Sequence, residues 1–152
     1  MLKQIKLDSL LKMDENELQN YLHKRLALMG RSVTVNPEFL YSPGSVPVLL
    51  VAHMDTVHRQ LPTVCKSEDG EIIMAPEGIG GDDRAGIFAV MKILEKHDCH
   101  VVFTQGEEIG GIGARAFVQS GIVPDINFII EPDRKGSDDA VFYDCGNDDF
   151  IM

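Results

Sequence analysis

The sequence has little that would point to a membrane, to secretion or to a disulfide-stabilised fold. No apolar run approaches the roughly 18 residues that a membrane span needs, and residues 1–8 alternate charge with apolar side chains instead of forming the apolar core of a signal peptide. Cys65, Cys99 and Cys145 are odd in number and widely spaced, which fits neither a disulfide framework nor a thiolate zinc site. We therefore expect a soluble protein of a reducing, cytoplasmic compartment.

Basic residues are also few, because 14 Lys and Arg face 24 Asp and Glu and leave a net charge of -10. A nucleic-acid-binding surface needs a basic face, so the sequence argues against a nucleic-acid partner. An acidic surplus suits cation binding instead. With 152 residues and 44% hydrophobic content, the chain is long enough to bury one core, and we expect residues 1–152 to form a single domain.

The hydrophobic pattern predicts helices that alternate with strands. A helix is expected over 14–29, because Asp14 and Glu17 resemble a capping box at its start and Gly30 can end it. Further helices are expected over 84–96, which is apolar on nearly every face, and over 114–119, and strands over 32–35, 38–41, 46–52, 101–104 and 126–130. This alternation predicts an α/β fold with a mostly parallel sheet flanked by helices.

Acidic or imidazole side chains follow each of the last three predicted strands. They are His53 and Asp55 after the first, Glu107 and Glu108 after the second, and Glu131 and Asp133 after the third. Ligands of open α/β sheets bind beyond the carboxyl ends of the strands, so we expect these side chains to converge. Asp82, just before the helix expected at residue 84, is a further candidate.

These residue types suit a metal site. His53 and Asp55 are two apart and can share one side of a strand, so that Asp55 orients the imidazole while its other nitrogen binds a metal. Asp82 has two oxygens that can bridge two cations, and of Glu107 and Glu108 one can bind metal while the other faces the substrate water. Taken singly, His53 could be an ordinary buried or surface histidine, Asp82 a helix cap and the two glutamates a solvated loop. Their joint placement favours the metal site, since so many carboxylates would repel one another without cations.

Three motifs of the sequence resemble those of a known family. They are Val51-Ala52-His53-Met54-Asp55-Thr56-Val57, Gly81-Asp82-Asp83-Arg84-Ala85-Gly86 and Gly106-Glu107-Glu108-Ile109-Gly110. They resemble those of the co-catalytic di-zinc exopeptidases, which include carboxypeptidase G, aminoacylase, peptidase T and glutamyl-aminopeptidase relatives. The resemblance covers residues 48 to 134 and implies a zinc-peptidase catalytic domain with a phosphorylase/hydrolase-like fold.

The resemblance also implies a role for each matching residue. His53 would bind one zinc ion, Asp82 would bridge two, and Glu108 would bind the other. Asp55 would orient His53, and Glu107 would be the general base. The next acidic ligand would be Asp133, with Glu131 as the alternative. The implied cofactor is two Zn²⁺, with Co²⁺ or Mn²⁺ as substitutes, and the implied substrate is a peptide or an N-acyl amino acid. Neither a nucleic acid nor a membrane is implied as a partner, and homo-oligomer formation is left open.

The sequence departs from the family in one respect, because no histidine follows Glu108 to complete the second zinc site. We expect the chain to be a catalytic domain that lacks its C-terminal part and a lid domain. His58 could replace the missing ligand, but a loop or surface histidine is the commoner case. Arg84, Arg115 and Arg134 could each bind a substrate carboxylate or neutralise neighbouring acids, and both readings stay open.

Two other functions remain as alternatives. A metal-binding module without catalytic activity would keep His53 and Asp82 and hydrolyse nothing. A nucleotide-binding domain is suggested by the glycine-rich segment 110–113 between a predicted strand and a helix, where such turns cradle phosphate. The neighbouring Glu107 and Glu108 would repel that phosphate, and the usual glycine spacing is incomplete.

Overall fold

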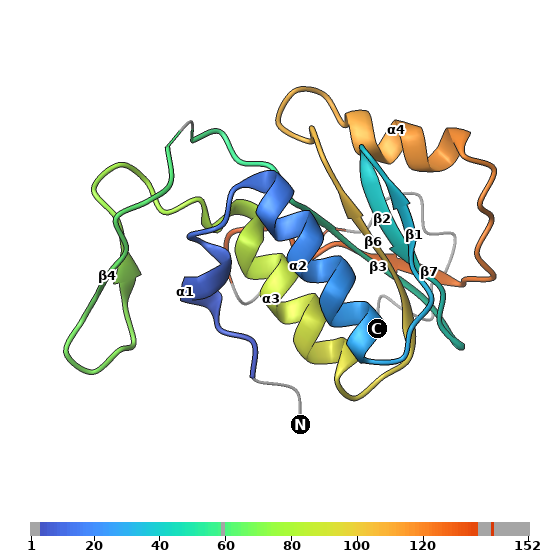
Figure 1. Cartoon of the computed structure of the whole chain (residues 1–152), viewed down its shortest axis with the longest axis horizontal. Coiled ribbons are helices and arrows are strands. Elements are labelled where there is room, and N and C mark those ends of the chain that lie inside the picture. The colour runs from blue at the N-terminus through green and yellow to red at the C-terminus, as the bar shows by residue number, and fades with distance from the viewer. Residues whose placement is uncertain (1–3, 59, 137–140, 142–152) are drawn as a thin grey trace.

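The computed structural model describes residues 4–58, 60–136 and 141, and it forms a five-stranded sheet with helices on both faces (Figure 1). Cys145 lies outside the described residues. The strands of this sheet are β1 (Thr34–Asn36), β2 (Phe39–Ser42), β3 (Val46–His53), β6 (Cys99–Thr104) and β7 (Phe128–Ile130). The helices are α1 (Leu7–Leu10), α2 (Glu15–Leu28), α3 (Gly81–Leu94) and α4 (Ile112–Gln119). Within the described part of the chain, no helix combines the length and the apolar character needed to cross a membrane.

The sheet has the strand order β1-β2-β6-β3-β7. Strand β3 pairs in parallel with β6 on one side and with β7 on the other. Strand β2 pairs antiparallel with both β1 and β6, so it is the strand that runs against the others. The prediction of an α/β fold with a mostly parallel sheet is therefore confirmed.

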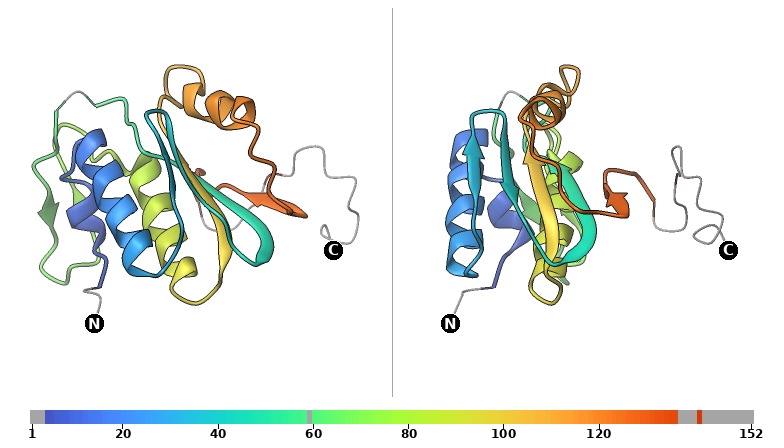
Figure 2. Two further views of the ribbon diagram at one scale, coloured as in Figure 1. Left: turned by 45° about the vertical axis from the view of Figure 1, so that its right-hand side comes forward. Right: turned by 90° about the vertical axis from the view of Figure 1, so that its right-hand side faces the viewer.

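The two faces of the sheet carry two hydrophobic clusters. On one face, α1, α2 and α3 pack through buried side chains such as Leu22 and Ile87 against Leu50 and Phe103 of the sheet. On the other face, Phe117 of α4 packs against Phe39 of β2, with their ring centroids 5.4 Å apart. Figure 2 shows α2 and α3 side by side, away from α4. Side chains that alternate along β3 and β6 thus contribute to the clusters on both faces of the sheet.

Most element boundaries lie close to those that the sequence pattern predicts. Helix α2 begins with the expected capping box, since Glu17 N–H donates to Asp14 and Asp14 N–H donates to the Glu17 carboxylate. Gly30 follows it with a φ of 80°, a conformation that favours glycine after a helix. Strand β3 extends to His53, α4 begins at residue 112, and β7 begins only at residue 128.

The interpretation of the segment 84–96 as a helix buried on nearly every face is only partly right. Ile87, Val90 and Met91 are buried, but Ile93 is 36% exposed because α3 covers the sheet with one face only. A small hairpin of β4 (Cys65–Lys66) and β5 (Ile73–Met74) was not predicted, since its two-residue strands are too short for an alternating pattern. It projects from the side of the molecule (Figure 1).

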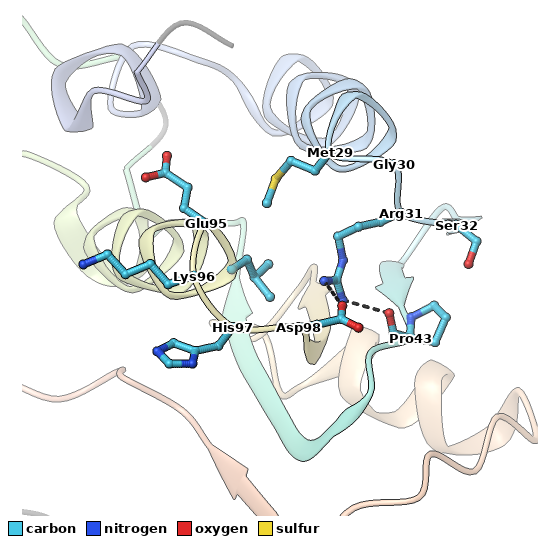
Figure 3. A pocket seen from close by; sticks show the side chains of 10 residues that line it. Met29, Gly30, Arg31, Ser32, Pro43, Glu95, Lys96, His97 and Asp98 are labelled. Atoms are coloured by element: carbon cyan, nitrogen blue, oxygen red, sulfur yellow. Dashed lines mark hydrogen bonds and ion pairs between the residues drawn. The ribbon is translucent and has the colours of Figure 1, made fainter. Parts of the chain in front are cut away.

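A pocket of about 510 Å³ lies at the amino end of β6, beside the carboxyl ends of α2 and α3 (Figure 3). Arg31 crosses it and ties three segments together. Its guanidinium donates to Ser42 Oγ at 3.0 Å, to the Pro43 and Cys99 carbonyls at 2.8 and 2.5 Å, and to Asp98 Oδ1 at 2.5 Å. The pocket is thus closed on one side by an arginine whose hydrogen bonds serve the fold.

Replacement of this arginine should destabilise the protein. Arg31→Ala leaves four hydrogen-bond acceptors without the guanidinium that donates to them. We therefore expect the free energy of unfolding to fall by about 2 kcal/mol. Urea denaturation followed by circular dichroism measures the change. Lys96→Ala is the control, because Lys96 lines the same pocket but is exposed. Equal stability of the two variants would contradict the structural role of Arg31.

Candidate metal centre

The predicted site residues meet at the carboxyl end of the sheet. His53 is the last residue of β3 and is fully buried, with 0% of its surface exposed. Asp82, at the start of α3, places Oδ1 3.0 Å from His53 Nε2, and Asp133, after β7, places Oδ2 3.7 Å from the same nitrogen. Glu107, after β6, has Oε2 4.0 Å from it. Carboxylates from three segments far apart in sequence therefore converge on one imidazole nitrogen.

Three of these side chains form a compact group that could hold a metal ion, which we call the metal triad. Ligand atoms of His53, Asp82 and Glu108 all lie within 4.8 Å of one another. His53 is buried, while Asp82 and Glu108 are exposed, so the group opens to solvent from one side. One imidazole nitrogen and carboxylate oxygens are donors that zinc accepts. The donor set fits a zinc ion.

Asp55 lies on the other side of the imidazole. Its Oδ1 is 3.3 Å from His53 Nδ1, and its backbone carbonyl is 3.1 Å from the same nitrogen. Its two carboxylate oxygens also accept the backbone N–H groups of Glu107 and Glu108, both at 3.1 Å. Asp55 therefore fixes the ring of His53 and, at the same time, the backbone that carries both glutamates.

These contacts set the ionisation of the pair. Burial works against the charge of Asp55, but the His53 hydrogen bond and the Glu107 and Glu108 N–H groups outweigh it and lower the Asp55 pKa to about 2. Burial also lowers the pKa of His53, yet hydrogen bonds to Asp55 and Asp82 raise it to about 9. Without a metal ion, His53 therefore carries a proton near neutral pH.

The remaining carboxylates crowd one another. Burial, and then contact with the Asp82 carboxylate, raises the pKa of Asp133. Burial, and then the charge of Asp133, raises the pKa of Asp83 to about 7. Burial also raises the pKa of Glu131, and the charge of Glu107 adds to this. Burial is thus the first cause of these raised pKa values, and repulsion between neighbouring carboxylates adds to it. A bound cation would relieve that repulsion.

Zinc binding near pH 7 should release a proton, because the imidazole must be neutral to bind metal while the His53 pKa lies near 9. Between pH 7 and 9 the apparent zinc affinity should rise about tenfold per pH unit for one displaced proton. Calorimetric titration in buffers of different ionisation enthalpy measures the protons released. A binding heat that does not depend on the buffer would contradict the protonated state of His53.

A groove of about 560 Å³ adjoins the metal triad, because Glu108 belongs to the triad and also lines the groove. Asp55, which contacts His53, lines the groove as well. The apolar side chains Val57, Ile109 and Ile112 line it and are 66%, 73% and 39% exposed. Carboxylates of Glu15 and Glu38 also line it. Sequence analysis missed this groove, because its lining comes from five separate segments that show no shared pattern in the chain.

The glycine-rich segment 110–113 does not form a phosphate cradle. The N–H groups of Gly110 and Gly111 donate to the Glu107 carbonyl, and that of Gly113 donates to the Gln105 carbonyl. A Cβ atom at Gly113 would lie 2.3 Å from the Glu38 carbonyl oxygen, so glycine is needed there for close packing. The backbone donors that would bind a pyrophosphate are already used.

His58, the possible substitute ligand, and Arg84, a possible substrate-binding residue, both contact other parts of the fold. His58 packs against the backbone of Gly78, where an added Cβ would lie 2.1 Å from its ring. Among the described residues, His58 does not belong to the group that could hold a metal ion. Arg84 is 3% exposed and donates to backbone carbonyls, so it does not face a substrate. Arg115 and Arg134 are exposed.

Comparison with known proteins gives sequence relatives and a structural relative. No family model matches the sequence. A probable carboxypeptidase of Aspergillus oryzae is 30% identical over 70% of this chain and 29% of its own length, and one of Aspergillus flavus is 31% identical over 57% of this chain and 23% of its own. The chain thus spans less than a third of the length of these relatives.

One structural relative is a tripeptidase from Staphylococcus aureus. It matches with a TM-score of 0.63 and 22% identity, over 88% of this chain and 45% of the tripeptidase. At this identity the match establishes the fold alone, and that fold agrees with the α/β architecture described above. The sequence relatives and the shared fold together support a peptidase family for this chain.

Proposed function

We propose that this chain carries the metal centre of a zinc-dependent exopeptidase or amidohydrolase, which cleaves a peptide or an N-acyl amino acid. The observation that carries the proposal is the convergence of Asp82, Glu107 and Asp133 within 3.0, 4.0 and 3.7 Å of His53 Nε2. The names of the sequence relatives support hydrolysis of peptides. The activity and the substrate belong to the proposal, since the chain spans 29% of the first of these relatives.

Each residue then has a defined task. His53, Asp82, Glu108 and Asp133 would hold two ions, with Asp82 between them and Glu131 as the alternative to Asp133. Bound zinc would supply a water whose pKa is lowered towards about 7. Glu107 would take the proton of the attacking water and deliver it to the leaving amine. The Asp55 carboxylate would hold the His53 ring at Nδ1, so that Nε2 of the ring faces the metal.

The groove beside Glu108 offers a place for the substrate. Its apolar residues Val57, Ile109 and Ile112 would contact an apolar side chain, whereas Glu15 and Glu38 would repel a carboxylate. Exposed apolar side chains around a concave surface commonly mark such binding sites. We therefore propose that an apolar side chain of the substrate occupies this groove.

A catalytically inactive metal-binding module is the second candidate, and one experiment separates it from the first. The chain is loaded with zinc or cobalt and assayed on a panel of dipeptides, tripeptides and N-acyl amino acids. Metal binding together with hydrolysis supports the proposal, and hydrolysis should cease when a chelator removes the metal. Metal binding without hydrolysis of any member of the panel would favour the inactive module.

A further inference from the structure

The side chain of Asp83 is buried beside the metal triad, but the proposed reaction does not use it. Only 2% of the residue is exposed. Asp82 and Asp83 both have non-helical backbone angles, so the regular part of α3 begins at Arg84. Asp83 Oδ1 accepts the Gly86 N–H at 2.9 Å, three residues further on. This is the geometry of a residue that caps a helix start.

The sequence alone suggested a cap at Asp82, and the structure assigns that task to its neighbour. Asp82 accepts no backbone N–H of α3 in the hydrogen bonds of the described residues, and its side chain is 68% exposed. Its Oδ1 instead lies 3.0 Å from His53 Nε2. The two adjacent aspartates therefore face in different directions, one into the helix start and one towards the imidazole.

The packing around Asp83 leaves its carboxylate little freedom. A Cβ atom added at Gly86 would lie 2.0 Å from Asp83 Oδ1 and 2.5 Å from Oδ2, so only glycine leaves room for the carboxylate. Oδ2 is buried without a hydrogen-bond partner among the described residues. The backbone N–H of His53, at the end of β3, lies near enough to this carboxylate to lower the pKa of Asp83. Asp83 thus lies between the first turn of α3 and the strand end that carries His53.

We propose that Asp83 is a positioning residue for the metal centre, which holds the start of α3 against His53 and so directs Asp82 towards the metal. The inference rests on the proposed function only in that Asp82 and His53 bind the metal. The Asp83 carboxylate acts by accepting the hydrogen bond of the Gly86 N–H. Its charge is not needed for this, so an asparagine that keeps the acceptor oxygen should keep the metal affinity.

The test compares zinc dissociation constants, measured by competition with a chromophoric chelator on samples shown to be folded by circular dichroism. Asp83→Ala should weaken zinc binding by about 10- to 100-fold, the range typical of residues that orient metal ligands. Gly86→Ala should weaken it similarly, because the added methyl group displaces the carboxylate while its charge remains. Asp83→Asn should bind zinc as the unaltered chain does.

Ile87→Val is the matched control, since it removes a buried methylene from the same turn of α3 without touching the cap. If Asp83→Ala binds zinc as tightly as Ile87→Val does, the positioning role is overturned. Gly86→Ala takes the place of Asp83→Ala in this comparison if Asp83→Ala does not fold. Weak binding by Asp83→Asn would also overturn the positioning role and would assign the effect to charge. Failure of the unaltered chain to bind zinc would instead refute the proposed function itself.

Discussion

Glu107→Gln should lose most of its peptide hydrolysis and keep its zinc. The glutamine has the same shape but cannot take a proton, so turnover should fall by about 10²- to 10⁴-fold, the usual contribution of a general base. The Glu107 side chain is 46% exposed and its Oε2 lies 4.0 Å from His53 Nε2, which places it at the mouth of the site. Steady-state hydrolysis with metal analysis of the same sample measures both quantities.

The control for this experiment is Glu71→Gln, which changes an exposed glutamate in the loop of the β4–β5 hairpin, outside the site. It should hydrolyse peptides at the rate of the unaltered chain. Full activity of a zinc-loaded Glu107→Gln would contradict the assignment of the general base. Loss of zinc from Glu107→Gln would show that Glu107 is a ligand, and the base would then have to be sought elsewhere.

Arg84→Met should lower the free energy of unfolding by about 3 kcal/mol or more, because it leaves buried carbonyl groups without donors. Arg84 Nε donates to the Met54 carbonyl at 3.1 Å, and Nη1 donates to the Leu10 and Met13 carbonyls at 2.7 and 2.8 Å. The side chain thus connects α1 and the segment before α2 to the end of β3. Chemical denaturation monitored by circular dichroism measures the loss.

The matched control is Arg115→Met on the exposed surface of α4. Substitutions of exposed residues usually change stability by less than about 0.5 kcal/mol. A similar stability of the two variants would contradict the structural role of Arg84. It would also reopen the possibility that Arg84 binds a substrate carboxylate, which its burial excludes in the present structure.

The sequence predicted best the elements whose pattern has a direct physical cause. Helix α2 was found because its capping box is local and its apolar residues recur with the helical period. Strands β3 and β6 are central in the sheet, so both of their faces are buried and their apolar runs are nearly continuous. Strand β7 was placed two residues too early, since at an edge the pairing to β3 decides where it starts.

The convergence of the site residues was predictable, because charged residues after parallel strands meet at one end of a sheet. The structure brings His53, Asp82 and Glu108 together as expected, while their roles and the choice between Asp133 and Glu131 stay predictions. Two features lay beyond the sequence. The groove needs the tertiary arrangement of its lining, and the capping task of Asp83 depends on backbone angles that no residue pattern shows.

The most direct test of the metal centre is a crystal structure of the zinc-loaded chain with anomalous diffraction at the zinc absorption edge. We predict a zinc peak bound by His53 Nε2 together with carboxylate oxygens of Asp82 and a further acid from Glu108 or Asp133. A peak at another histidine, or a zinc-saturated crystal with no peak beside His53, would contradict the account.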